Sequence, residues 1–134
     1  MLTVILDTNF LIYCAKYKID YEAEIDRLFN EKYDVIITDQ ILDEFEELSE
    51  NRLGKEKAVI ELAKSIVDVK IKNNKIKLKE VLADDADYSI IKIASQAKKA
   101  IIATLDKELE NEAIKRLKNI QFLTIKQKTH LSLV

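Results

Sequence analysis

The chain has 134 residues, of which 48% are hydrophobic and 34% are charged, and its net charge is −2. This balance is typical of a globular protein, and no apolar run approaches the roughly 20 residues of a membrane span. One cysteine excludes a disulfide framework and favours a cytoplasmic location, while one glycine and no proline exclude the glycine-rich nucleotide-binding loops. We therefore expect a single domain over residues 1–134.

The first stretch predicts a buried strand that leads directly into a helix. The apolar run from Val4 to Leu6 suits a parallel strand buried on both faces, and it ends abruptly at Asp7. Thr8 or Asn9 can cap a helix that continues to Tyr17. Asp7 would then lie at the carboxyl end of a strand, where open α/β sheets bind their ligands.

The remaining sequence alternates between expected helices and expected strands. Apolar residues at helical spacing predict helices over residues 20–30, 39–51, 55–67, 84–98 and 106–118. Apolar runs predict buried strands over residues 33–38, 100–104 and 120–125. Alternating apolar and lysine residues over 68–78 predict a strand or hairpin with one cationic face. This order indicates a three-layer α/β/α sandwich around a central parallel sheet.

Four acidic residues occupy positions that this fold would gather at one edge of the sheet. Asp7 and Asp106 each follow a buried strand, and right-handed crossovers keep the carboxyl ends of such strands on one edge. Glu44 lies near the inward-facing side of the helix that begins at Asp39. Asp87 lies on the buried side of a later helix, in its first turn. We expect all four carboxylates to converge.

The convergence of these carboxylates predicts a metal site. Neighbouring carboxylates repel one another, and burial raises their pKa values further unless a cation is present. Oxygen ligands are those that hard divalent ions such as Mg²⁺ or Mn²⁺ prefer. One or two such ions would activate a water and stabilise the leaving oxygen when a phosphodiester bond is broken.

Four segments resemble motifs of the PIN-domain nucleases, and together they span essentially the whole chain: VILDTNFLI, TDQILDEFEEL, ADDADYSIIKIA and IIATLDKEL. The resemblance implies that Asp7 is the first acid of the site, with Asn9 in the D-x-N position of the family. It implies that Glu44 is the acid on the helix after the second strand.

The last two motifs complete the implied acid set. Asp87 matches the acid of the family's D-x-x-I-x-x-x-A helix. Asp106 matches the acid of its T-x-D turn, with Thr104 as the polar partner. Asp84 and Asp85 precede Asp87 at the same helix start, where their charge complements the helix dipole. Either of them could replace or supplement Asp87, because the D-D-x-D cluster permits more than one register.

The resemblance implies a Mg²⁺- or Mn²⁺-dependent endoribonuclease. Its short stand-alone members include VapC-type toxins, which cleave RNA and are held inactive by an antitoxin protein, and members often form homodimers. The alternatives within the family are a PIN nuclease of ribosomal RNA processing and a PIN-like module that binds RNA or protein without cutting. The complete acid set disfavours the silent module. A phosphoacceptor signalling domain is also disfavoured, because Asp39 stands in a helix-capping context.

Cationic residues are concentrated in the second half of the chain. Residues 1–69 contain 8 basic and 16 acidic residues, whereas residues 70–134 contain 14 basic and 8 acidic residues. The lysine-rich stretches could follow an RNA backbone while Tyr or Phe side chains stack on bases, or they could be solvated faces. We expect Cys14 to fill the core and His130, the single histidine, to be exposed.

Overall fold

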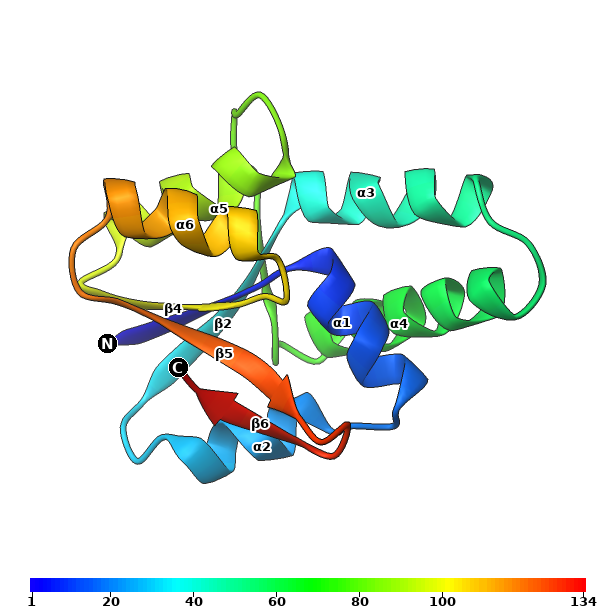
Figure 1. Ribbon diagram of the computed structural model, residues 1–134, viewed down its shortest axis with the longest axis horizontal. Coiled ribbons are helices and arrows are strands. Elements are labelled where there is room, and N and C mark those ends of the chain that lie inside the picture. Colours follow the sequence, from blue (N-terminus) through cyan, green and yellow to red (C-terminus); the bar gives the residue numbers. More distant parts are fainter.

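The chain forms six strands and six helices over residues 1–134, all of which the computed structural model describes. Figure 1 shows their arrangement. The strands are Leu2–Leu6 (β1), Tyr33–Thr38 (β2), Lys77–Lys79 (β3), Lys99–Ala103 (β4), Ile120–Lys126 (β5) and His130–Leu133 (β6). The helices are Thr8–Lys16 (α1), Tyr21–Leu28 (α2), Asp39–Glu50 (α3), Gly54–Lys72 (α4), Ala86–Gln96 (α5) and Lys107–Arg116 (α6).

All the strands belong to one sheet with the order β3-β2-β1-β4-β5-β6. Neighbouring strands are parallel except for β5 and β6, which are antiparallel. Strands β2 and β3 are added in turn on one side of β1. The chain then returns across the sheet, and β4 pairs with the other side of β1. This change of direction creates a topological switch point between β1 and β4, where sheets of this kind bind ligands beyond the carboxyl ends of their strands.

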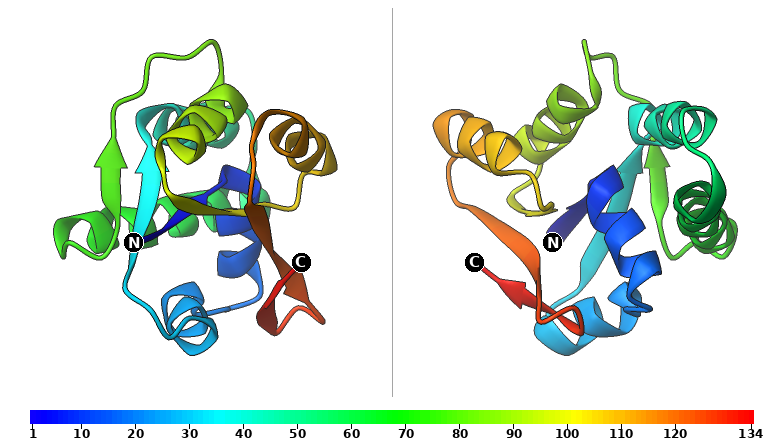
Figure 2. Two further views of the ribbon diagram at one scale, coloured as in Figure 1. Left: turned by 90° about the vertical axis from the view of Figure 1, so that its left-hand side faces the viewer. Right: turned by 45° about the vertical axis from the view of Figure 1, so that its right-hand side comes forward.

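The helices form two layers that cover the two faces of the sheet. On one face α1 and α3 pack against α4, and on the other α5 packs against β1, β2 and β4 while α6 packs against β5. Figure 2 shows α5 and α6 on the side opposite α1, α3 and α4. The predicted three-layer α/β/α sandwich is therefore confirmed, with β6 added as an antiparallel edge strand.

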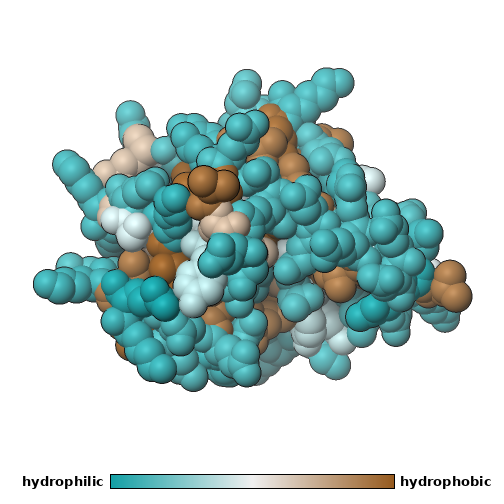
Figure 3. All heavy atoms as spheres, turned by 90° about the horizontal axis from the view of Figure 1, so that it is seen from above, coloured by the Kyte–Doolittle hydropathy of each residue, from teal (hydrophilic) through white to brown (hydrophobic).

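The two central strands are the most deeply buried part of the core. Val4 to Leu6 in β1 and Ile101 to Ala103 in β4 have no exposed surface. Because these strands consist of continuous apolar residues, both of their faces can be covered by helices. Exposed apolar side chains are scattered among hydrophilic ones, as the face in Figure 3 shows. None of the helices combines the length and the apolar character that crossing a membrane requires.

Side-chain caps fix where most of the helices begin. Asp7 caps α1 by accepting the N–H of Thr8, so the prediction that Thr8 or Asn9 caps this helix is wrong. The reason is that Asp7 already has the extended backbone of a capping residue and its side chain reaches the first free N–H. Capping side chains also precede four other helices: Asp20, Thr38, Asp85 and Asp106.

The predicted strand or hairpin over residues 68–78 is wrong in its first half. Helix α4 continues to Lys72, because the buried Val67 and the half-buried Ile71 are one helical turn apart and face the core together. The chain reverses at Asn74, which has a positive φ of 61°. Only the short, exposed β3 then pairs with β2. Helical packing on the core thus overrides the local alternation of apolar residues and lysines.

The C-terminal strand β6 was not expected from the sequence, and α2 holds its outer edge. The N–H of Leu131 donates to Glu24 Oε1 at 2.9 Å, and Arg27 Nη2 donates to the Leu131 carbonyl at 3.1 Å. We call Glu24 and Arg27, which are also ion-paired at 3.0 Å, the α2 clasp. His130 begins β6 and is half-buried, so the expectation of an exposed histidine is wrong.

Candidate active site

Thr104 connects the ends of the two strands that flank the switch point. Its hydroxyl donates to Asp7 Oδ2 at 2.7 Å and accepts the backbone N–H of Asp106 at 3.0 Å. Asp7 directly follows β1, and Asp106 follows β4 as the N-cap of α6. The structure therefore brings these two acids to the same edge of the sheet.

Asp7 is held rigidly at this edge. Its side chain is 4% exposed, and its second oxygen, Oδ1, accepts the N–H of Thr8 at 2.8 Å. Both carboxylate oxygens thus have a hydrogen-bond donor, which fixes the orientation of the group. A buried carboxylate needs such donors because burial without them is strongly unfavourable.

Glu44 and Asp87 approach the same edge from two helices. The hydroxyls of Thr38, at the end of β2, and Ser89, on α5, are hydrogen-bonded at 2.8 Å. This bond joins the point where α3 begins to the first turn of α5, which contains Asp87. Glu44 on α3 and Asp87 on α5 are both half-buried. Sequence reasoning missed Ser89, although a hydroxyl residue on the buried side of a helix was a visible signal.

The charges of the predicted acids act on Asp7. Desolvation raises the pKa of Asp7 above its usual value of 3.8. The hydrogen bonds from Thr104 and Thr8 oppose this rise, and the negative charges of Glu44 and Asp106 add to it. The mutual repulsion indicates that Glu44 lies close enough to the strand ends to share their environment.

Asp87 has the most perturbed carboxylate of the group. Desolvation, followed by the charge of Asp7 and then that of Asp106, raises the pKa of Asp87 from 3.8 to about 6. Asp85 and Glu44 contribute smaller effects in the same direction, and no hydrogen bond or cation offsets them. Perturbation by desolvation together with specific charge partners is typical of functional sites.

The other predicted site residues lie at the margin of this cluster. Asp85 caps α5 by accepting the N–H of Tyr88 at 2.9 Å, and both Asp85 and Asp84 are exposed. Asn9 is exposed in the first turn of α1. Asp85 therefore has a structural role at the helix start, and Asp87 is the acid of this segment whose pKa the charge of Asp7 raises.

The cluster provides oxygen donors but not a finished metal cage. No group of three or more His, Cys, Asp or Glu side chains has a geometry that could hold a metal ion as it stands. The donor type nevertheless fits a hard divalent cation, and an uncompensated group of carboxylates is the environment that such a cation stabilises. Glu44 and Asp87 are only half-buried, so their side chains have room to change orientation at this edge.

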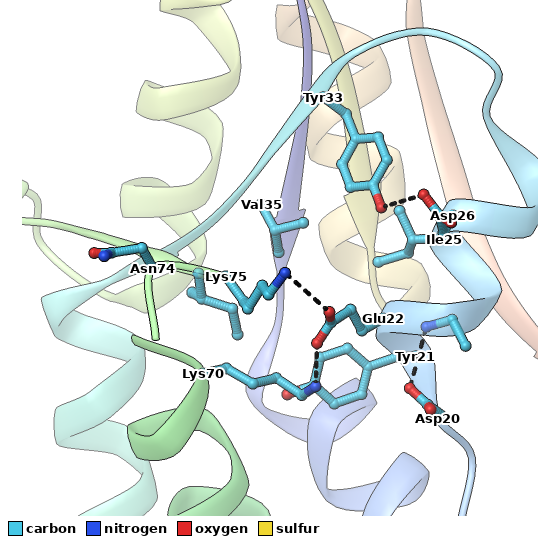
Figure 4. Close-up of a pocket in the computed structure, with 12 residues that line it drawn as sticks. Asp20, Tyr21, Glu22, Ile25, Asp26, Tyr33, Val35, Lys70, Asn74 and Lys75 are labelled. Atoms are coloured by element: carbon cyan, nitrogen blue, oxygen red, sulfur yellow. Dashed lines mark hydrogen bonds and ion pairs between the residues drawn. The ribbon is translucent and has the colours of Figure 1, made fainter. Parts of the chain in front are cut away.

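A different hollow of about 520 Å³ lies away from this edge, between α2, the first half of β2 and the end of α4 (Figure 4). Glu22 lies between two lysines there, at 2.6 Å from Lys70 Nζ and 4.0 Å from Lys75 Nζ. The Tyr33 hydroxyl donates to Asp26. The acidic side chains of this hollow thus have lysine, hydroxyl or backbone N–H partners, in contrast to the repelling carboxylates at the switch point.

Comparisons with known proteins agree with this arrangement. A family model described as "PIN like domain" matches residues 4–128. A protein named Ribonuclease VapC4 from Methanocaldococcus jannaschii is 37% identical over 99% of this chain and 97% of its own length.

Solved structures show the same fold at lower sequence identity. The PIN domain endonuclease Utp24 has a TM-score of 0.71 at 22% identity, covering 98% of this chain and 90% of that one. VapBC2 from Rickettsia felis, solved with a DNA fragment from its promoter, has a TM-score of 0.58 at 16% identity, covering 92% and 99%. The resemblance inferred from the sequence motifs is confirmed, and the chain belongs to the PIN-like domain family.

Proposed function

We propose that this protein is a metal-dependent endoribonuclease of the VapC type that hydrolyses RNA phosphodiester bonds. The observation that carries the proposal is the group of repelling carboxylates at the switch point, centred on the buried Asp7 and the strongly perturbed Asp87. The similarity to a protein named as a ribonuclease over nearly the whole chain supports the same assignment.

The proposed reaction uses the acids as ligands of Mg²⁺ or Mn²⁺. The bound ion would supply an activated water and stabilise the negative charge that develops on the leaving oxygen. Asp7 is the fixed ligand, because two hydrogen bonds orient it. Asp106 uses Oδ1 to cap α6, which leaves Oδ2 for a ligand. Glu44 and Asp87 complete the set from α3 and α5.

Substitution of Asp7 by Asn tests the proposal. We expect Mn²⁺-dependent cleavage of single-stranded RNA to be abolished, because the amide removes the negative charge that binds the cation. We expect the fold to remain, because Asn is also a good N-cap and can still accept the N–H of Thr8. Circular dichroism checks the fold, and a fluorogenic RNA checks the activity.

Asp20→Asn is the matched control, because Asp20 caps α2 with the same kind of bond at an exposed position. This variant should cleave RNA like the wild type. Cleavage retained by a folded Asp7→Asn protein would overturn the proposal. A silent RNA- or protein-binding module would instead give no cleavage by the wild type and no saturable Mn²⁺ binding in calorimetry.

We further propose an antitoxin protein as the partner and a homodimer as the functional state. The names of the VapC and VapBC relatives support the proposal of an antitoxin partner. Light scattering of the purified chain tests the dimer. Co-purification with the product of a neighbouring gene, together with inhibition of cleavage by that product, distinguishes a toxin from a nuclease of ribosomal RNA processing.

A further inference from the structure

Two tyrosines, Tyr13 on α1 and Tyr17 at its C-cap, have their rings in tilted contact. The rings of Tyr13 and Tyr17 are one helical turn apart, with centroids separated by 4.5 Å and planes inclined by 46°. Both side chains are half-buried, so part of each ring faces solvent. Tyr17 also packs against the hydrophobic core, and these contacts hold a partly exposed aromatic surface in place.

Positive charge surrounds this aromatic surface. Lys16 Nζ lies 5.4 Å from the centroid of the Tyr17 ring, and Lys128 Nζ, from the turn between β5 and β6, lies 5.2 Å from it. Figure 1 shows this turn beside the C-terminal end of α1. Desolvation raises the pKa of the Tyr17 phenol, but the charges of Lys128 and Lys16, together with side-chain interactions with Tyr13 and Lys16, lower the pKa overall.

The lysines in this region differ from many others in the chain because they have no acidic partner. Ten ion pairs occur in the structure, and they include Lys64, Lys70, Lys77 and Lys99. None of them involves the lysines at the end of α1 or in the β5–β6 turn, which are Lys16, Lys18, Lys126 and Lys128. Their charges therefore remain available to an anionic partner.

The tyrosines lie on a line that starts near Asp7. Asn9, Tyr13 and Tyr17 are spaced by four residues, so they follow one face of α1, and Asn9 is in the first turn, which Asp7 caps. At 1.5 Å per residue, Tyr13 and Tyr17 lie about 9 and 15 Å along the helix from Asp7. This distance is within reach of a strand a few nucleotides long.

We propose that Tyr13, Tyr17, Lys16 and Lys128 form a platform that binds the single-stranded RNA substrate, with bases stacked on the tyrosines and phosphates beside the lysines. Aromatic rings flanked by cations are the common means of gripping a single strand without reading its sequence. We call these four residues the α1 platform. The proposal rests on the proposed ribonuclease function and identifies where the substrate is held next to the cleavage site.

The test measures RNA binding separately from cleavage. The binding of a fluorescein-labelled oligouridine is followed by fluorescence anisotropy with Ca²⁺ in place of Mn²⁺. Replacing both Tyr13 and Tyr17 by Leu keeps the apolar volume on α1 but removes the aromatic faces. We expect Kd to rise at least about tenfold, because stacking on a base contributes on the order of a factor of ten. Replacing both by Phe should leave Kd within about twofold of the wild type.

A second pair of variants tests the cations. Changing Lys16 and Lys128 to Gln should reduce the slope of log Kd against log salt by about 1.4, since each single-strand phosphate contact contributes about 0.7. The matched control replaces Lys32 and Lys98 by Gln, because these exposed lysines precede β2 and β4 at the opposite edge of the sheet. The control should leave the salt dependence unchanged.

The outcomes separate the platform from the ribonuclease activity. Tyrosine-dependent RNA binding by a wild type that does not cleave supports the platform and overturns the proposed activity. Cleavage by the wild type, with unchanged RNA binding in the folded leucine and glutamine variants, overturns the platform. If this face bound a protein partner instead of RNA, the variants would likewise show unchanged RNA binding, and the platform would be overturned.

Discussion

Asp7 combines two roles that are difficult to separate at the scale of a single residue. Its carboxylate caps α1 and also lies at the centre of the acidic group. A capping Asp at the end of a strand is common, so position alone did not distinguish a structural residue from a functional one. The distinction comes from the surroundings of Asp7: burial raises its pKa, the charges of Glu44 and Asp106 add to the rise, and the hydrogen bonds from Thr104 and Thr8 oppose it.

Thr104 is the positioning residue whose removal should disturb both the fold and the site. Thr104→Val keeps the shape but removes the donor to Asp7 and the acceptor for the N–H of Asp106. Because a hydrogen bond to a charged group contributes roughly 1.5–3 kcal/mol, we expect the free energy of unfolding to fall by about 2 kcal/mol. Urea unfolding measures this change.

Thr104→Ser is the control for this substitution because it restores the hydroxyl. It should recover most of the stability and of the cleavage activity. A valine variant as stable and as active as the wild type would show that the hydroxyl does not position Asp7.

The raised pKa of Asp87 predicts how stability depends on pH. The folded protein binds the Asp87 proton more tightly than the unfolded chain does, with a pKa of about 6 against 3.8. Protonation of Asp87 therefore makes its full contribution to the free energy of unfolding below pH 3.8, and this contribution is lost as the pH rises through 6. At pH 7 the charged Asp87 destabilises the metal-free protein, and Asp87→Asn should remove this effect.

We expect Asp87→Asn to raise the free energy of unfolding by about 1 kcal/mol at pH 7. This is well below the free energy that the whole pKa shift of Asp87 would correspond to, because water screens a half-buried group. Urea unfolding in EDTA at pH 4 and pH 7 measures it. The difference between variant and wild type should be larger at pH 7. A variant that is less stable at pH 7 would contradict the electrostatic account.

At the scale of elements, the α2 clasp explains how a short terminal strand stays on the sheet. Glu24→Ala removes the acceptor of the Leu131 N–H and the partner of Arg27. We expect a loss of about 1–2 kcal/mol and faster amide exchange at Leu131, since a partly buried N–H would lose its partner. Lys64→Ala, which breaks an exposed i,i+4 pair, is the control and should change the stability by less than about 0.5 kcal/mol.

The accuracy of the sequence-based predictions differed between elements for physical reasons. Strands β1, β2 and β4 and the helices that follow them were predictable, because continuous apolar runs end at a capping residue. The end of α4 was not, because Ile71 fits both a strand alternation and a helical turn, and only packing with Val67 decides between them. Strand β6 was not predictable, because Glu24 and Arg27, about a hundred residues away, satisfy its backbone.

The candidate site was predictable in its composition but not in its supporting bonds. Strand order alone brings Asp7 and Asp106 to one edge. The contact between Thr38 and Ser89 depends on how α5 packs over β2, which no local pattern encodes. The acidic segment allowed more than one register in the sequence, and only the structure shows that Asp85 caps α5.

At the scale of the whole molecule, a cation at the acidic edge should stabilise the fold. Binding to the folded state alone raises the free energy of unfolding by about 2.7 kcal/mol at a hundredfold excess over Kd. We expect Mn²⁺ to raise the Tm saturably in the wild type and to have little effect on Asp7→Asn. Differential scanning fluorimetry across a Mn²⁺ titration measures this, and equal shifts in both proteins would argue against a site at Asp7.

The pairing of β1 with β4 has a consequence for translation of the protein. The hydroxyl that holds Asp7 belongs to a residue 97 positions later in the chain. While the ribosome has released only the first three α/β units, one side of β1 is bare and Asp7 has no Thr104 to orient it. A nascent chain that ends before Thr104 therefore lacks an assembled acidic edge. The acidic edge can assemble only after β4 and Thr104 have emerged from the ribosome.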